Sequence, residues 1–172
     1  MFRTGLFFLE LIMIIKTAGK TNSDDEKLIK WDPKFKIGIP LIDRQHEHLV
    51  NLCNDFYQSL LKSKSNAKED YHALVKQTLE KCLNYAATHF KEEERLMEAS
   101  KFSGYKQHRD THNSFTAKCE IAYAGIDTMP ISEAIKFALF LYDWINTHIA
   151  HEDRLYMPTL VEFLKEQQSK QA

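Results

Sequence analysis

Residues 89–112 read HFKEEERLMEASKFSGYKQHRDTH, and this segment contains two pairs of ionisable side chains spaced four residues apart. His89 and Glu93 form the first pair, and His108 and His112 form the second. Residues four apart on an α-helix face the same way, so each pair presents two metal donors to one point. The short connection between the pairs predicts two antiparallel helices. Both pairs are therefore expected at the same end of a helical bundle.

Apolar residues recur at steps of three and four on both sides of this segment, which predicts further helices. The first main helix is expected over about residues 41–63, and the second follows Ser65 and Asn66, with Glu69 completing a capping box, and runs to about Leu96. The third is expected from Ser103 as the cap to Gly125, and the fourth from Ile131 to before Pro158. Five Gly and four Pro are too few for the turns of a β protein. The predicted fold is all-α: an antiparallel up-down-up-down four-helix bundle with an N-terminal extended arm and a short C-terminal helix ending near Gln168.

Composition restricts the class of protein and its partners. A chain of 172 residues with 44% apolar residues suits one compact domain. The 23 Lys and Arg against 24 Asp and Glu give a net charge of -1, which argues against binding to nucleic acid or to an anionic membrane. Three Cys without a CxxC pair favour a reducing compartment, so a cytoplasmic location is expected.

Residues 1–20 carry an apolar run that is similar to a short signal peptide. Glu10 in its middle and the poor cleavage pattern Thr17-Ala18-Gly19 favour a non-essential extension instead, and the run is too short to span a membrane. We therefore expect an apolar extension and polar linker over residues 1–29 and the bundle over 30–172.

The residues before Asn22 are expected to be dispensable, because all helical stripes and candidate ligands follow them. A protein beginning at Asn22 should keep its melting temperature and its metal content. A large fall in either would indicate that the extension packs on the bundle. Recovery of only a cleaved form from outside the cytoplasm would restore the signal-peptide interpretation.

Further donors join the two pairs at the same end of the predicted bundle. His46 lies near the start of the first helix and His148 near the end of the fourth. Asp153 follows His148 by five residues, about 140° away around an ideal helix, so the helix must widen locally or end there for its carboxylate to point inward. A single pair of ionisable residues four apart on a helix is usually a solvated surface feature. Here four helices carry ionisable groups on their buried stripes at the same level along the bundle axis, which favours a metal site.

Five imidazoles and two carboxylates are too many for one tetrahedral zinc and suit two octahedral irons that share the carboxylates and a solvent-derived bridge. The predicted ligands are His46, His89, Glu93, His108, His112, His148 and Asp153.

The remaining titratable groups are expected to have other roles. His48, His72 and His151 should lie on the surface or beside a ligand, and the charged run 91–95 should be solvated apart from Glu93. Each Cys is seven residues from a predicted ligand, so Cys53, Cys82 and Cys119 are expected to form one core layer about 10 Å from the metal. We expect them to act as small buried hydrophobes; the alternative is a thiol pair that peroxide oxidises.

Several motifs together resemble the hemerythrin family, in particular its single-domain bacterial members, the bacteriohemerythrins. They are Trp31-Asp32, Ile37-Gly38-Ile39-Pro40, Ile42-Asp43, Gln45-His46, His89-Phe90, Glu93-Glu94, Met97, His108 with His112, and Trp144 with His148 and Asp153. The chain departs from the family pattern at Phe102-Ser103, at Thr111 and at Ile145, where Leu is usual. None of these departures changes a predicted ligand.

The resemblance implies reversible dioxygen binding by a protein that is not an enzyme, for oxygen storage or for delivery to an oxygen-requiring enzyme. One iron would be held by His108, His112 and His148 and the other, which binds oxygen, by His46 and His89. Glu93, Asp153 and an oxo or hydroxo group would bridge them, and Trp144, Ile145 and Ile149 would line the oxygen pocket. Two alternatives remain open: an oxygen or redox sensor, and a di-iron enzyme that handles nitric oxide or peroxide or donates iron for repair.

Overall fold

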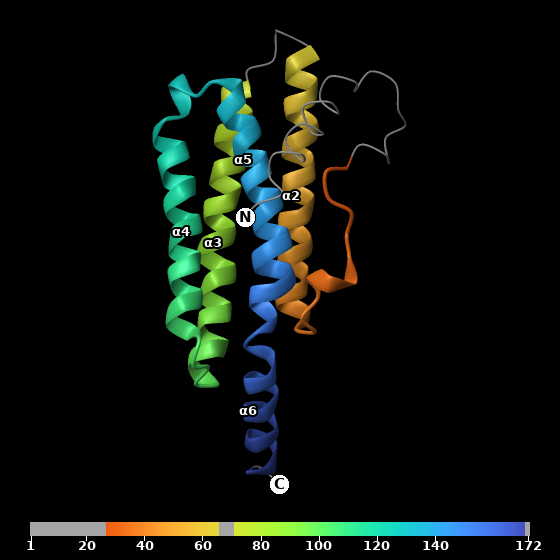
Figure 1. Ribbon diagram of the computed structural model, residues 1–172, viewed down its shortest axis with the longest axis vertical. Helices are drawn as coiled ribbons and strands as arrows, with labels where there is room; N and C mark the ends of the chain where they lie inside the picture. The colour runs from red at the N-terminus through yellow and green to blue at the C-terminus, as the bar shows by residue number, and fades with distance from the viewer. Residues whose placement is uncertain (1–26, 66–70, 171–172) are drawn as a thin grey trace, which may run out of the picture.

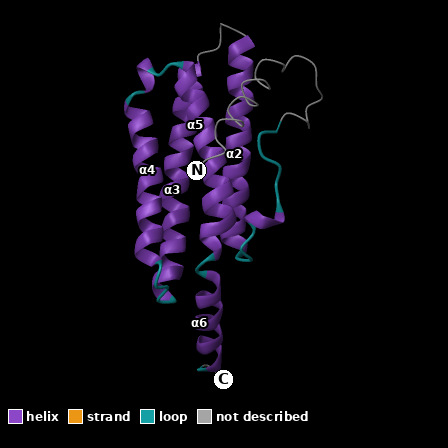
Figure 2. Cartoon of the chain, viewed as in Figure 1, coloured by secondary structure: helices purple, strands orange, loops and turns teal. Residues whose placement is uncertain are grey.

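A computed structural model describes residues 27–65 and 71–170, so the predictions for residues 1–26 and for the Glu69 capping box lie outside the described residues. The long helices are α2 (Pro40–Ser65), α3 (Tyr71–Ala99), α4 (Tyr105–Ala124) and α5 (Ile131–Trp144). They run alternately up and down, with α3 beside both α2 and α4 and α5 beside α2 (Figure 1). The described residues contain no strand (Figure 2), and the predicted all-α four-helix bundle is confirmed.

Shorter elements complete the chain at both ends of the bundle (Figure 1). The 3-10 helix η1 (Pro33–Phe35) precedes α2, and η2 (Ile126–Thr128) joins α4 to α5. The π-helix η3 (Ile145–Ile149) and the 3-10 helix η4 (Glu152–Arg154) extend α5, and α6 (Met157–Ser169) then projects beyond the bundle along its axis (Figure 1). Pro158 lies in the first turn of α6, where its missing N–H breaks no helical hydrogen bond.

The turn between α3 and α4 differs from the prediction. Gly104, not Ser103, precedes the first residue of α4, and no side chain caps the helix. Lys101 adopts a left-handed φ of 57°, which lets the Phe102 N–H donate to the Met97 carbonyl at 2.9 Å and close α3. The Tyr105 N–H then donates to the Phe102 carbonyl at 3.1 Å. Because backbone groups close the turn, the Ser103 hydroxyl is not needed as a cap.

The core between the helices contains the three cysteines as free, fully buried thiols. The Cys119 thiol on α4, together with burial, raises the pKa of the Cys82 thiol on α3, so these two thiols lie close together as the predicted layer requires. Burial raises the pKa of the Cys53 thiol to about 12, and its Sγ lies 3.8 Å from the Ala138 carbonyl on α5. Neutral thiols of this kind pack as small hydrophobes; oxidation by peroxide stays a prediction.

The segment before α2 is attached to the bundle by a buried asparagine. The Ile29 N–H donates to Asn54 Oδ1 at 2.9 Å, and Asn54 Nδ2 donates to the Ile29 carbonyl at 2.9 Å. Ile29 is only 4% exposed and belongs to the main core, as does Phe35 of η1. Packing therefore begins before residue 30, and the domain boundary proposed there stays a prediction.

Replacing Asn54 with alanine is expected to lower the free energy of unfolding by about 1–3 kcal/mol, because two buried backbone groups of Ile29 lose their partners. Urea unfolding measures the change. Asn51→Ala, at an exposed position of the same helix, is the matched control and should stay within about 0.5 kcal/mol of the parent. Equal effects of the two substitutions would contradict the role of Asn54.

None of the helices in the described part of the chain combines the length and the apolar character needed to cross a lipid bilayer.

Candidate metal centre

The seven predicted ligands meet inside one end of the bundle, and all of them are buried. α2 contributes His46, α3 contributes His89 and Glu93, α4 contributes His108 and His112, and the extension of α5 contributes His148 and Asp153. Their donor atoms form two overlapping groups within which all atoms lie within 4.8 Å of one another. The first group is Glu93, His108, His112, His148 and Asp153, and the second is His46, His89, Glu93 and Asp153.

The two carboxylates belong to both groups and lie between them. Asp153 Oδ1 lies 3.0 Å from His148 Nε2 and 3.4 Å from His108 Nε2, whereas its Oδ2 lies 3.2 Å from His46 Nε2. Glu93 Oε2 lies 3.4 Å from His89 Nε2 and 3.5 Å from His112 Nε2. Each carboxylate therefore faces imidazoles of both groups.

Asp153 reaches the interior through a local change in the helix. Residues Ile145–Ile149 form a π-helix, with the Ala150 N–H donating to the Ile145 carbonyl, and a 3-10 turn at Glu152–Arg154 follows. The wider turn shifts the register of the residues after it, so His148 and Asp153 face the same interior. The sequence argument required the helix to widen or to end, and both occur.

Several of the inward donor atoms are buried without a hydrogen bond. They are Nε2 of His46, His89 and His108, Oε2 of Glu93, and both carboxylate oxygens of Asp153. Buried polar atoms are normally paired, because an unpaired one costs several kcal/mol in an apolar interior. Bound cations would satisfy all of these atoms, so this nitrogen and oxygen donor set fits a pair of first-row transition-metal ions.

The pKa values of the buried groups follow from burial and from mutual charge. Burial lowers the pKa of His89 to about 4, so its imidazole is neutral at pH 7, which is the form that binds metal. Burial and the nearby Asp153 act to raise the pKa of Glu93, but the imidazoles around it, including His89, outweigh them and hold it at about 2. Burial also acts to lower the pKa of His148, yet Asp153 and Glu152 raise it to about 9.

Aromatic and aliphatic side chains enclose the donor atoms. The Phe90 ring stacks on His112 with centroids 3.8 Å apart, and the Trp144 ring stacks on His148 at 4.0 Å. Ile145 and Ile149, which were predicted with Trp144 to line an oxygen pocket, are fully buried in the same core. This part of the site excludes water from the donors.

Side chains that hold the ligands were missed from sequence. Tyr156 is buried and its hydroxyl donates to Glu93 Oε1 at 3.0 Å. Glu94, predicted to be solvated, instead accepts from His112 Nδ1 at 3.0 Å, and Glu152 accepts from His148 Nδ1 at 2.8 Å. The four-residue spacing of His148 and Glu152 could have revealed their contact. The contact of Glu94 with His112 joins two helices and has no local signal in the sequence.

The other histidines lie apart from the donors, as predicted. His48 and His151 are exposed, and His72 Nε2 lies 3.0 Å from the Met129 carbonyl, near the opposite end of α3 from His89. None of the three belongs to either donor group.

The fold and the site together define a four-helix bundle whose two adjoining buried clusters of histidine and carboxylate could hold cations. The family model for the hemerythrin HHE cation binding domain matches residues 37–160. The chain belongs to the hemerythrin family.

Named relatives agree with this assignment. The chain is 29% identical to a myohemerythrin of Sipunculus nudus over 126 residues, 73% of this chain and 88% of the relative. It is 27% identical to a bacteriohemerythrin of Pseudomonas paraeruginosa over 140 residues, 79% of this chain and 84% of the relative. A hemerythrin-like protein of Naegleria gruberi is 28% identical over 130 residues, 76% of this chain and 92% of the relative. The predicted family is confirmed, and the myohemerythrin and bacteriohemerythrin groups match to a similar degree.

Proposed function

We propose that this protein binds dioxygen reversibly at a non-haem di-iron centre and serves oxygen storage or delivery. His108, His112 and His148 hold one iron, His46 and His89 hold the other, and Glu93 and Asp153 bridge them. The observation that carries the proposal is the set of buried, unpaired donor atoms that faces one interior point from four helices. The names of its relatives, myohemerythrin and bacteriohemerythrin, support the same function.

The donor set favours reversible binding over oxidation chemistry. The iron pair supplies the two electrons that oxygen binding draws on. Imidazoles, which bind metal in their neutral form, outnumber carboxylates in this site, so it has less anionic charge to stabilise high-valent iron than four-carboxylate bundles have. Release of intact dioxygen is therefore favoured over its cleavage.

The unequal number of imidazoles determines where a small ligand can enter. A metal held by three imidazoles and the two shared carboxylates would have more protein ligands than one held by two imidazoles and the same carboxylates. A metal held by His46 and His89 would therefore have the fewer protein ligands, and dioxygen is proposed to bind there. Trp144 stacks on His148, and Ile145 and Ile149 are fully buried in the same core. Their role in this proposal is to keep water and protons away from bound dioxygen.

Anaerobic reduction of the iron-loaded protein, followed by stopped-flow mixing with dioxygen, tests the proposal. We expect two irons per chain and an oxygenated spectrum that persists and reverts under vacuum. Rapid decay of that spectrum with repeated turnover would contradict a carrier and would indicate an enzyme. Absence of bound iron would contradict the di-iron centre itself.

Ile145→Leu is expected to change oxygen release or autoxidation while two irons per chain are retained. Ile145 is fully buried at the start of the π-helix, and its β-branched side chain fills space differently from leucine at nearly equal volume. Dissociation and autoxidation rates measured for both proteins provide the test. Equal rates would show that residue 145 does not control access to the site.

A further inference from the structure

The outward nitrogens of the ligand imidazoles meet acceptors of different charge in the two groups. In the three-histidine group, His112 Nδ1 donates to the Glu94 carboxylate at 3.0 Å. His148 Nδ1 donates to the Glu152 carboxylate at 2.8 Å. Two of the three imidazoles in this group therefore donate to a negative charge.

The two-histidine group has neutral acceptors only. His46 Nδ1 donates to the backbone carbonyl of Phe35 at 2.7 Å. His89 Nδ1 donates to the side-chain amide oxygen of Gln45 at 3.0 Å. The asymmetry is therefore built from four separate contacts, each on a different imidazole.

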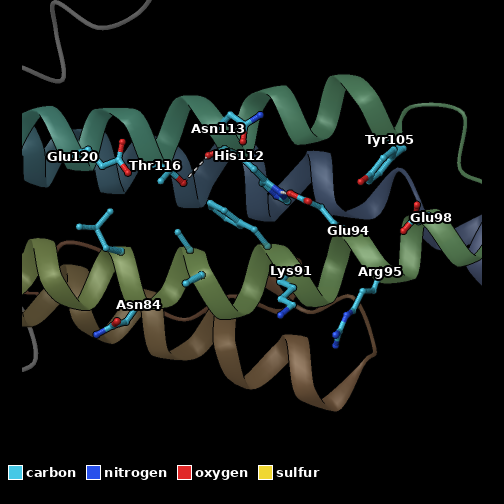
Figure 3. A pocket seen from close by; sticks show the side chains of 14 residues that line it. Asn84, Lys91, Glu94, Arg95, Glu98, Tyr105, His112, Asn113, Thr116 and Glu120 are labelled. Carbon is cyan, nitrogen blue, oxygen red and sulfur yellow. Dashed lines mark hydrogen bonds and ion pairs between the residues drawn. The ribbon is translucent and has the colours of Figure 1, made fainter.

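The Glu94 and Glu152 carboxylates lie beside the imidazoles and are partly exposed. Glu94 lies in the groove of about 750 Å³ between α3 and α4, where its carboxylate meets the His112 ring (Figure 3). The Glu94 side chain is 25% exposed and the Glu152 side chain 41% exposed. Among the described residues neither carboxylate makes an ion pair with a lysine or arginine, so the charge of each acts on its ligand imidazole.

A carboxylate acceptor changes the imidazole more than an amide or a carbonyl does. It attracts the Nδ1 proton more strongly and so leaves more negative charge on Nε2, the atom that faces the metal. A more basic ligand stabilises a ferric ion more than a ferrous ion, because the ferric ion carries the higher charge. The acceptor therefore influences which iron gives up an electron first.

We propose that Glu94 and Glu152 are positioning residues that make the three-histidine iron the more easily oxidised of the two. Phe35 and Gln45 leave the two-histidine iron, where dioxygen enters, at a higher reduction potential. This inference rests on the proposed di-iron function and adds the order in which the two irons are oxidised.

The test compares charge-neutral variants with the parent in the full-length, iron-loaded protein. Glu94→Gln and Glu152→Gln keep an oxygen that can accept from Nδ1 and remove the charge. Spectroelectrochemical titration gives the midpoint potentials of the two one-electron steps. We expect each variant to disfavour the first oxidation roughly tenfold, which corresponds to about 59 mV, and to slow autoxidation, with two irons retained.

Two further variants complete the design. Gln45→Glu places a negative charge beside His89 Nδ1 in the other group. It should lower the midpoint potential of the second one-electron step and so reduce the separation of the two potentials. Glu98→Gln is the matched control, because Glu98 is exposed on the same helix and lines the same groove but makes no contact with a ligand imidazole among the described residues. It should leave both potentials unchanged.

Unchanged potentials in both glutamine variants, with two irons still bound, would overturn the proposal. Loss of iron from both variants would overturn it as well, because these residues would then hold the site together rather than adjust its potential. Failure of the parent protein to bind two irons would instead contradict the proposed function. The two failures are therefore distinguishable by iron analysis of the parent.

Discussion

His89→Ala and His112→Ala are each expected to abolish the intact two-iron centre. His89 is one of only two imidazoles in its donor group, and His112 is one of three in the other. Glu93 Oε2 lies 3.4 Å from His89 Nε2 and 3.5 Å from His112 Nε2. If either imidazole is removed and its metal ion is lost, the buried Glu93 carboxylate has no cation beside it. Iron content should fall below two per chain, and the near-ultraviolet charge-transfer bands of the pair should disappear.

His48→Ala and His151→Ala are the matched controls, because both side chains are exposed and outside the donor groups. These variants should retain two irons and the parent spectrum. A His89 or His112 variant that kept two irons and reversible oxygen binding would show that the ligands are assigned wrongly.

Removal of the metal is expected to lower the melting temperature by roughly 10 °C. A ligand that binds only the folded state at a thousand times its dissociation constant stabilises it by about 4 kcal/mol. For a chain of this size each kcal/mol corresponds to about 2–4 °C. Metal-free protein also retains the unpaired donor atoms of His46, His89 and Asp153 in its interior. Calorimetry with and without a chelator measures the difference.

The His89→Ala variant is the control for this measurement. It should melt at nearly the same temperature with and without iron, because its centre cannot form. Equal melting temperatures for the parent protein in the two conditions would mean that metal binding does not depend on the folded bundle.

The bundle could be predicted because its signals are local in the sequence. Apolar stripes at steps of three and four indicate the helices, and Gly125 and Pro130 mark the end of α4 and the start of α5. The antiparallel topology then places His46, His89 and His148 at one height, as observed. Even the irregular helix before Asp153 follows from the five-residue spacing, because no regular α-helix brings both residues to one face.

What the sequence determined by itself was therefore the helices, their order and the identity of the inward donors, since all of these depend on the periodicity of a helix. The tertiary structure alone decided how the donors are supported. Glu94 meets His112 across two helices, and Tyr156 meets Glu93 over 63 residues of chain, so neither contact leaves a periodic signal. The Ser103 cap failed for a related reason, because a left-handed Lys101 lets backbone groups close the turn. Contacts that depend on how elements pack are absent from any single helix, and here one of them places the negative charge of Glu94 beside the His112 imidazole.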